Sequence, residues 1–160
     1  MRFLAFLAVL ALAGCGGHGS PAPRTPASAA APPGPGTTLY AGGDWAVVVD
    51  GAKATAFHRV GGTWKADRSG AVKIRVLGPD GTVASIPQVA AELSAKAPLV
   101  ESGMWVDGTE LLAKGGGLTA TRGTIYGAPA VPLAKGKHVA VAYGRTSGHA
   151  TAVGWSFRVQ

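Results

Sequence analysis

The chain has 160 residues, one cysteine and a formal net charge of +7. A single cysteine excludes both a disulfide framework and a cysteine-based zinc knuckle. The basic residues stand singly with no run of Lys and Arg, so we expect no nucleic-acid partner, and solvated surface side chains explain most of the charge. The alternative is attraction to anionic polymers or headgroups of a cell envelope.

Residues 1–14 read MRFLAFLAVLALAG: one positive charge at Arg2 is followed by an apolar run. The run is too short to span a bilayer as a mature helix and indicates a signal peptide. It ends in the letters LAGC, which resemble the lipobox of bacterial lipoproteins. The resemblance implies that Cys15 becomes the new N-terminus and carries a diacylglyceryl thioether and an N-acyl chain such as palmitate, enough for stable membrane anchoring. The alternative is an ordinary secretory signal, which would leave a lone thiol without a disulfide partner.

Residues 15–38 follow this signal and consist largely of Gly, Pro, Ala and Ser with no apolar period. Such a segment buries too little apolar surface to offset the entropy of ordering. We therefore expect a disordered tether, partly polyproline II, between the lipidated cysteine and the folded part.

Residues 39–81 are predicted to form a small β-meander. Short Val-rich and Thr-rich segments at 44–49, 53–60, 63–67 and 71–77 alternate with turn signals, and helical patterns are nearly absent. The Asp50-Gly51 and Gly61-Gly62 pairs supply the positive φ that tight hairpins require. One segment, 87–98, has good helix formers but fits a strand equally well.

Residues 82–160 contain, in order, the segments IPQVAAEL, SGMWVDG, IYGAPAVPLAKGKHVAVAYG and GWSFRV. This order resembles bacterial immunoglobulin-like domains of surface and envelope proteins. The resemblance implies an antiparallel sandwich that needs no disulfide. The last hairpin lacks the acidic residue that related domains often carry there, which argues against a calcium site.

The final strand, VGWSFRVQ, alternates large apolar residues with small or polar ones. We expect Trp155 and Phe157 to fill the space between two sheets, and Ser156 and Arg158 to face outward. The strand is predicted to pair in a hairpin with KHVAVAY. The sequence therefore predicts an all-β fold: a signal peptide and tether, a meander and an immunoglobulin-like sandwich.

No common catalytic motif is present in the sequence, and the one cysteine is assigned to lipid. His58, His138 and His149 lack ligand-like spacing; the alternative is that the last hairpin brings His138 and His149 together. We expect no metal and no cofactor.

The four tryptophans offer an aromatic platform for glycan or parts of the core. Trp45 and Trp155 alternate with apolar residues and are predicted to be core. Trp64 and Trp105 have less apolar neighbours and are predicted to be exposed ligand-binding aromatics.

The sequence thus predicts a non-catalytic, lipid-anchored protein of the periplasm or cell surface that acts as a binding, adhesion or spacer module. Its expected partners are the membrane, through the lipid on Cys15, and peptidoglycan, a wall polymer or another envelope protein. The alternative is an accessory module of a cell-wall enzyme system or a glycan-binding lipoprotein.

Overall fold

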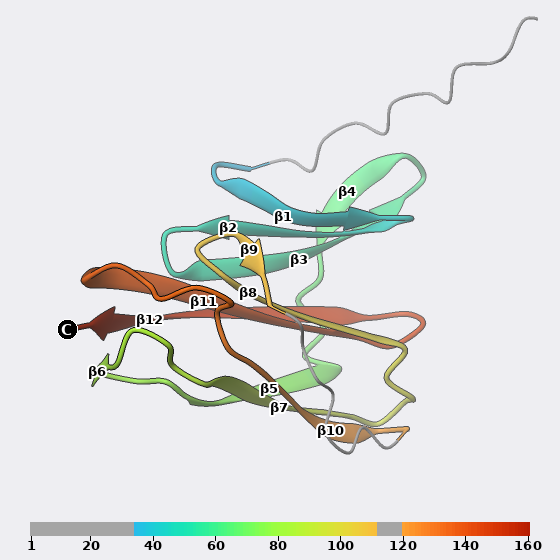
Figure 1. Ribbon diagram of the computed structural model, residues 1–160. Coiled ribbons are helices and arrows are strands. Elements are labelled where there is room, and N and C mark those ends of the chain that lie inside the picture. The colour runs from blue at the N-terminus through green and yellow to red at the C-terminus, as the bar shows by residue number, and fades with distance from the viewer. Residues whose placement is uncertain (1–33, 112–119) are drawn as a thin grey trace, which may run out of the picture. The chain divides into compact units, whose positions relative to one another are not determined.

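The computed structural model describes residues 34–111 and 120–160 (Figure 1). The predicted signal peptide, Cys15 and most of the tether lie outside these residues. All regular structure in the described ranges is β-strand, and they contain no helix long and apolar enough to cross a membrane. The prediction of an all-β fold is confirmed.

The first four strands form one antiparallel sheet in chain order, which we call the meander sheet. The glycines of its two predicted tight turns adopt positive φ angles of 57° at Gly51, 59° at Gly61 and 81° at Gly62. Its strands are β1 (Thr37–Gly42), β2 (Trp45–Asp50), β3 (Lys53–Val60) and β4 (Thr63–Ala66).

The remaining strands form two further sheets. The outer sheet has the order β10-β7-β5, and the central sheet has the order β6-β12-β11-β8-β9. The outer sheet contains β5 (Val72–Gly78), β7 (Val89–Ala95) and β10 (Arg122–Gly127). The central sheet contains β6 (Thr82–Val83), β8 (Glu101–Val106), β9 (Thr109–Glu110), β11 (Gly136–Arg145) and β12 (Ala150–Val159).

These two sheets have the strand order of an immunoglobulin-like sandwich. The first, second and fourth long strands of the sandwich share one sheet, and the third and the last two share the other. The first strand then switches sheets through the short β6, which pairs in parallel with β12. The predicted immunoglobulin-like sandwich is therefore correct, as is the predicted hairpin between β11 and β12.

One predicted strand belongs to a different sheet from the one expected. Segment 71–77 was assigned to the meander, but it is β5 and pairs with β7, from Val72 opposite Ala95 to Val76 opposite Ala91. Its alternation places Val72 and Ile74 toward the sandwich core. Segment 87–98, open between helix and strand, is the strand β7.

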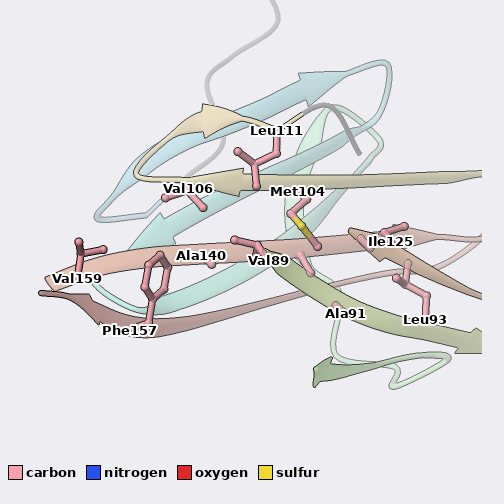
Figure 2. Packing of buried hydrophobic residues seen from close by; sticks show 11 residues of the cluster. Val89, Ala91, Leu93, Met104, Val106, Leu111, Ile125, Ala140, Phe157 and Val159 are labelled. Atoms are coloured by element: carbon pink, nitrogen blue, oxygen red, sulfur yellow. The ribbon is translucent and has the colours of Figure 1, made fainter. Parts of the chain in front are cut away.

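The sandwich core lies between the outer and central sheets (Figure 2). Leu93 and Ile125 from the outer sheet pack with Met104 and Phe157 from the central sheet, and all four are buried. Trp155 is only half-buried, and its Nε1 donates a hydrogen bond to the carbonyl of Pro79 at 3.0 Å. Phe157 thus fulfils its predicted core role, whereas Trp155 packs against the edge of that core.

A second core lies between the meander sheet and the other face of the central sheet. Val141 and Tyr143 of β11 pack there against Trp45 and Val47 of β2, while Ala140 and Ala142 face the sandwich core. Strand β11 is thus buried on both faces, with its larger side chains toward the meander. Since β3 also contacts β12, the central sheet has a layer on each side (Figure 1).

Candidate functional site

The two predicted ligand-binding tryptophans are buried. Trp64 is 8% exposed and lies beneath Arg59, whose guanidinium carbon is 5.5 Å from the ring centroid. Trp105 is 3% exposed, and its ring centroid is 6.5 Å from that of Tyr143 in the second core. The prediction that they form an exposed surface is wrong, because the apolar neighbours that bury Trp105 come from strands distant in sequence.

The three histidines of the folded part lie in separate places. His58 stacks on Trp45 with ring centroids 4.0 Å apart. His138 pairs with Phe157 near one end of the β11–β12 ladder, whereas His149 lies in the turn at the other end, so they do not approach each other. Across residues 34–111 and 120–160, no three His, Cys, Asp or Glu residues gather in a way that would hold a metal ion.

His138 is held by two acceptors. Its Nδ1 lies 2.6 Å from Asp107 Oδ2, and its Nε2 lies 2.8 Å from the carbonyl oxygen of Ala134. When the ring is protonated, both nitrogens donate, and these hydrogen bonds raise the pKa of His138 despite its burial. Asp107 Oδ1 also accepts the Val139 N–H at 2.9 Å, so this group fixes the β8–β9 turn to β11.

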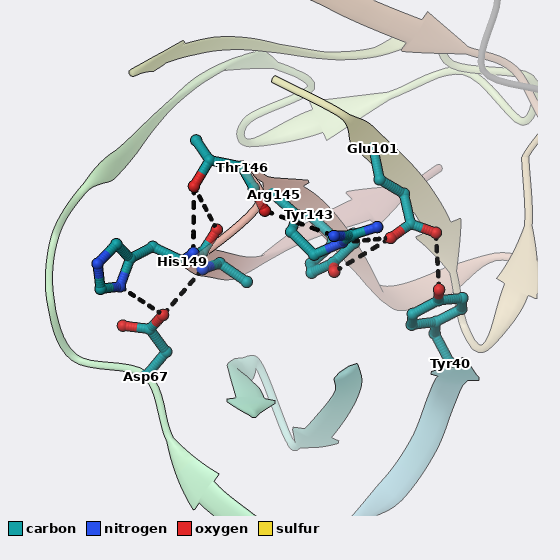
Figure 3. Close-up of polar contacts among 8 residues, drawn as sticks. Tyr40, Asp67, Glu101, Tyr143, Arg145, Thr146 and His149 are labelled. Atoms are coloured by element: carbon teal, nitrogen blue, oxygen red, sulfur yellow. Dashed lines mark hydrogen bonds and ion pairs between the residues drawn. The ribbon is translucent and has the colours of Figure 1, made fainter. Parts of the chain in front are cut away.

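A cluster around Glu101 joins the meander sheet to the central sheet (Figure 3). Glu101 Oε1 accepts the Tyr40 hydroxyl at 2.6 Å, and Oε2 accepts the Arg145 Nε–H at 2.7 Å and the Tyr143 hydroxyl at 3.5 Å. The Arg145 guanidinium carbon also lies 5.6 Å from the Trp45 ring centroid. The donors come from β1 and β11 and the acceptor from β8, so the carboxylate bridges the two sheets.

Burial and mutual contact shift the pKa values in this cluster. Burial opposes ionisation of Glu101, but hydrogen bonds from Tyr40 and Arg145 and the Arg145 charge outweigh it and lower its pKa. Burial and the Glu101 carboxylate raise the pKa of Tyr40 to about 12 and also raise that of Tyr143. The cluster is therefore an anion held by neutral hydroxyls and a guanidinium, which suits a structural bridge.

A second cluster fixes the β11–β12 turn (Figure 3). Asp67 Oδ2 accepts the Ala150 N–H at 2.9 Å and lies 3.3 Å from His149 Nδ1, while Oδ1 accepts the Ser69 N–H at 2.9 Å. Burial would raise the pKa of Asp67, but the amides of Ser69 and Ala150 and the His149 ring hold it below its usual range.

The residue types in this second cluster are those of a nucleophilic triad, but the geometry differs. A triad requires a hydroxyl hydrogen-bonded to the histidine ring. Thr146 Oγ1 instead accepts the main-chain N–H of His149 at 3.1 Å and donates to its carbonyl at 3.2 Å. The hydroxyl thus closes the turn and is not aligned for proton transfer to the ring.

Beside this turn lies an open hollow of about 560 Å³, which we call the turn pocket. Lys73 and Lys96 supply its charged lining groups, and His149, Ser69, Ser94 and three alanines line much of the rest. The pocket was not predicted, because Lys73 and Lys96 appear in the sequence as isolated surface lysines. Their adjacency arises from the pairing of β5 with β7.

Comparisons with known proteins identify no family for this chain. No protein-family model matches the chain, and no curated protein matches it. Among solved structures, the chain is similar to the titin Ig tandem domains A164–A165, with a TM-score of 0.36 and 8% sequence identity, covering 76% of this chain and 75% of that chain. The assignment of an immunoglobulin-like sandwich rests on the strand order of the outer and central sheets.

Proposed function

We propose that this protein is a non-catalytic binding module of the bacterial cell envelope, held at the membrane by lipid on Cys15. The main support for this proposal is the turn pocket, an open hollow lined by two lysines next to the β11–β12 turn, which Asp67 fixes. Pockets of this size are typical of ligand sites, and loops positioned by a rigid scaffold commonly supply such sites. A sandwich does not by itself define a function, so the proposal depends on the pocket.

The geometry around the histidines supports binding over catalysis. Asp67, His149 and Thr146 are engaged with one another's main chain or with neighbouring amides. Glu101 is engaged by Tyr40 and Arg145. A general base needs a free position within hydrogen-bond reach of its substrate, and these carboxylates are already committed to structural donors.

Retention on cell-wall material tests the proposed binding role. The mature chain carrying Cys15→Ser, purified without lipid, is mixed with washed peptidoglycan sacculi and with wall-polymer and envelope-protein extracts. We expect saturable retention on one of these fractions. If none retains the protein, the binding role fails and a pure spacer role is favoured.

Membrane anchoring has its own test. Wild-type protein is expected to incorporate a labelled fatty acid and to fractionate with membranes, and Cys15→Ser is expected to abolish both. Unchanged membrane association of the Cys15→Ser variant would overturn the lipoprotein assignment. Neither result depends on what the folded part binds.

The alternative role, an accessory module of a cell-wall enzyme system, also requires a binding surface. In that case the retained partner is a protein in the envelope extract. Retention on sacculi or purified wall polymer without added protein would exclude this version.

A further inference from the structure

The turn pocket is built where three parts of the sandwich meet. The segment entering β5 contributes Ser69 and Ala71, the end of β7 contributes Ala95 and Lys96, and the β11–β12 turn contributes His149. Figure 3 shows Asp67 reaching this turn from the segment before β5. Because Asp67 accepts the main-chain N–H of Ala150 as well as contacting His149, one wall of the pocket is fixed to another.

The charged lining groups of the pocket all have the same sign. They are Lys73 and Lys96, and no Asp or Glu is among the lining residues. Both lysines are exposed, and the ion pairs found in the described part of the chain include neither of them. The two lysines therefore keep positive charge that no described carboxylate pairs with, whereas Asp67 contacts His149.

The neighbouring arginines differ in this respect. On the same outer face, Arg75 and Arg122 both contact Glu92, which lies between them. Arg145 is likewise paired with Glu101. Glu92 and Glu101 are thus paired with arginines, and Asp67 is held by main-chain amides and His149, so the two pocket lysines remain available to a ligand.

The strand register places a lysine next to a hydroxyl. Lys73 is directly opposite Ser94 in the β5–β7 ladder, and residues opposite each other on one face have Cβ atoms roughly 4.5–5.5 Å apart. Ser69 Oγ lies on another wall, where it accepts the Ala71 N–H at 3.3 Å. The Ser69 hydroxyl also hydrogen-bonds the Asp67 carboxylate, so the donors that line the pocket for a ligand are the lysine ammonium groups and the Ser94 hydroxyl.

The rest of the lining limits the body of the ligand. The methyl groups of Ala71, Ala95 and Ala97 make much of the wall apolar and leave room for small groups. A volume of about 560 Å³ lies within the range of roughly 300–1,000 Å³ typical of ligand pockets. Since the hollow is open to solvent, it suits one segment of a longer chain.

We infer that the turn pocket binds an oxyanion, carboxylate or phosphate, on an anionic cell-wall polymer, through Lys73 and Lys96. Ammonium and hydroxyl groups are donors without a competing acceptor charge, which favours an anion and disfavours a cation. The inference deepens the proposed binding role and rests on it. It adds the ligand class and the two residues that would recognise it.

The test measures binding of two probes to the mature Cys15→Ser chain by calorimetry. One probe is a muropeptide with free carboxylates, and the other is a glycerol phosphate oligomer. We expect saturable binding of one of them, weakened about tenfold or more in Lys73→Gln/Lys96→Gln, since the double variant removes both charge-assisted donors. The probe that binds identifies the oxyanion.

The matched control is Lys53→Gln/Lys65→Gln, which removes the same charge from two exposed lysines of the meander sheet. We expect its affinity to stay within about twofold of wild type, because distant surface charges are screened at physiological salt. An equal loss in both double variants would show general electrostatic attraction and overturn the inference. Retention on sacculi or extracts with no binding of either probe would also overturn it while leaving the proposed binding role intact.

Discussion

Gly154 allows the most direct test of how the meander sheet packs on the sandwich. A Cβ atom built at this position would lie 2.6 Å from the carbonyl oxygen of Ala52 and 3.2 Å from the amide nitrogen of Ala54. Both are main-chain atoms, one in the β2–β3 turn and the other at the start of β3, so neither can move aside by a side-chain rotation. In Gly154→Ala, the meander must therefore move away from β12.

Two opposing effects set the expected magnitude. Glycine in a strand interior is less favourable than alanine by about 0.5–1 kcal/mol, which would make the substitution stabilising in an uncovered strand. Overpacking a closely packed contact costs about 1–3 kcal/mol. We therefore expect Gly154→Ala to lower the free energy of unfolding by roughly 0.5–2 kcal/mol.

The assay is urea unfolding followed by tryptophan fluorescence, since Trp45 and Trp105 lie in the second core and report on its integrity. The matched control is Gly148→Ala in the β11–β12 turn. A Cβ there meets nothing within 4 Å, and its φ lies outside the left-handed range. This control is expected to be neutral or stabilising by up to about 1 kcal/mol.

The two variants must differ for the reasoning to hold. If Gly154→Ala is as stable as Gly148→Ala, the meander does not press on β12 at Ala52. A lower denaturation midpoint with an unchanged m value would instead indicate that the meander and sandwich unfold as one unit.

Two further predictions concern the polar clusters. Tyr40→Phe and Glu101→Gln should each lower the free energy of unfolding in urea by roughly 1–3 kcal/mol. The double variant should lose less than the sum of the two single losses, because the Tyr40 hydroxyl and the Glu101 carboxylate share one hydrogen bond. Strictly additive losses would contradict the bridge. Because the pKa of His138 is raised in the folded state, its stabilising effect is fully present below the unfolded value of about 6.5 and is lost as the pH rises through the folded pKa. The stability difference between wild type and His138→Gln should therefore be larger at pH 6 than at pH 9, and a difference that grows with pH would refute the role of Asp107 as its partner.

Much of the strand content and several turns were predictable from local pattern. The alternation in β12 identified Phe157 as core and Ser156 and Arg158 as exposed, because strand side chains alternate between two faces. The Asp50-Gly51 and Gly61-Gly62 turns were predictable because glycine adopts positive φ without steric cost. The order of segments from β7 to β12 resembles that of bacterial immunoglobulin-like domains, and that resemblance predicted the sandwich.

The candidate site was not predictable in the same way. Lys73 and Lys96 are separated by most of β5 and β7 and the connection between them, and only the antiparallel ladder brings them to one pocket. The prediction that Trp64 and Trp105 are exposed was wrong for a related reason. Trp105 has a polar local context, but its ring is covered by residues of the meander that lie far from it in sequence.

The sequence by itself determined where most strands and the tight turns fall and which residues share a strand face, since these depend on backbone sterics and a period of two. It also carries the export and lipidation signal, which stays a prediction. The tertiary structure decided what covers each face: segment 71–77 joins the outer sheet, β11 is buried on both sides, and two lysines line one pocket. Alternation defines two faces of a strand, but strand partners and register, set by packing between distant segments, decide which face meets water.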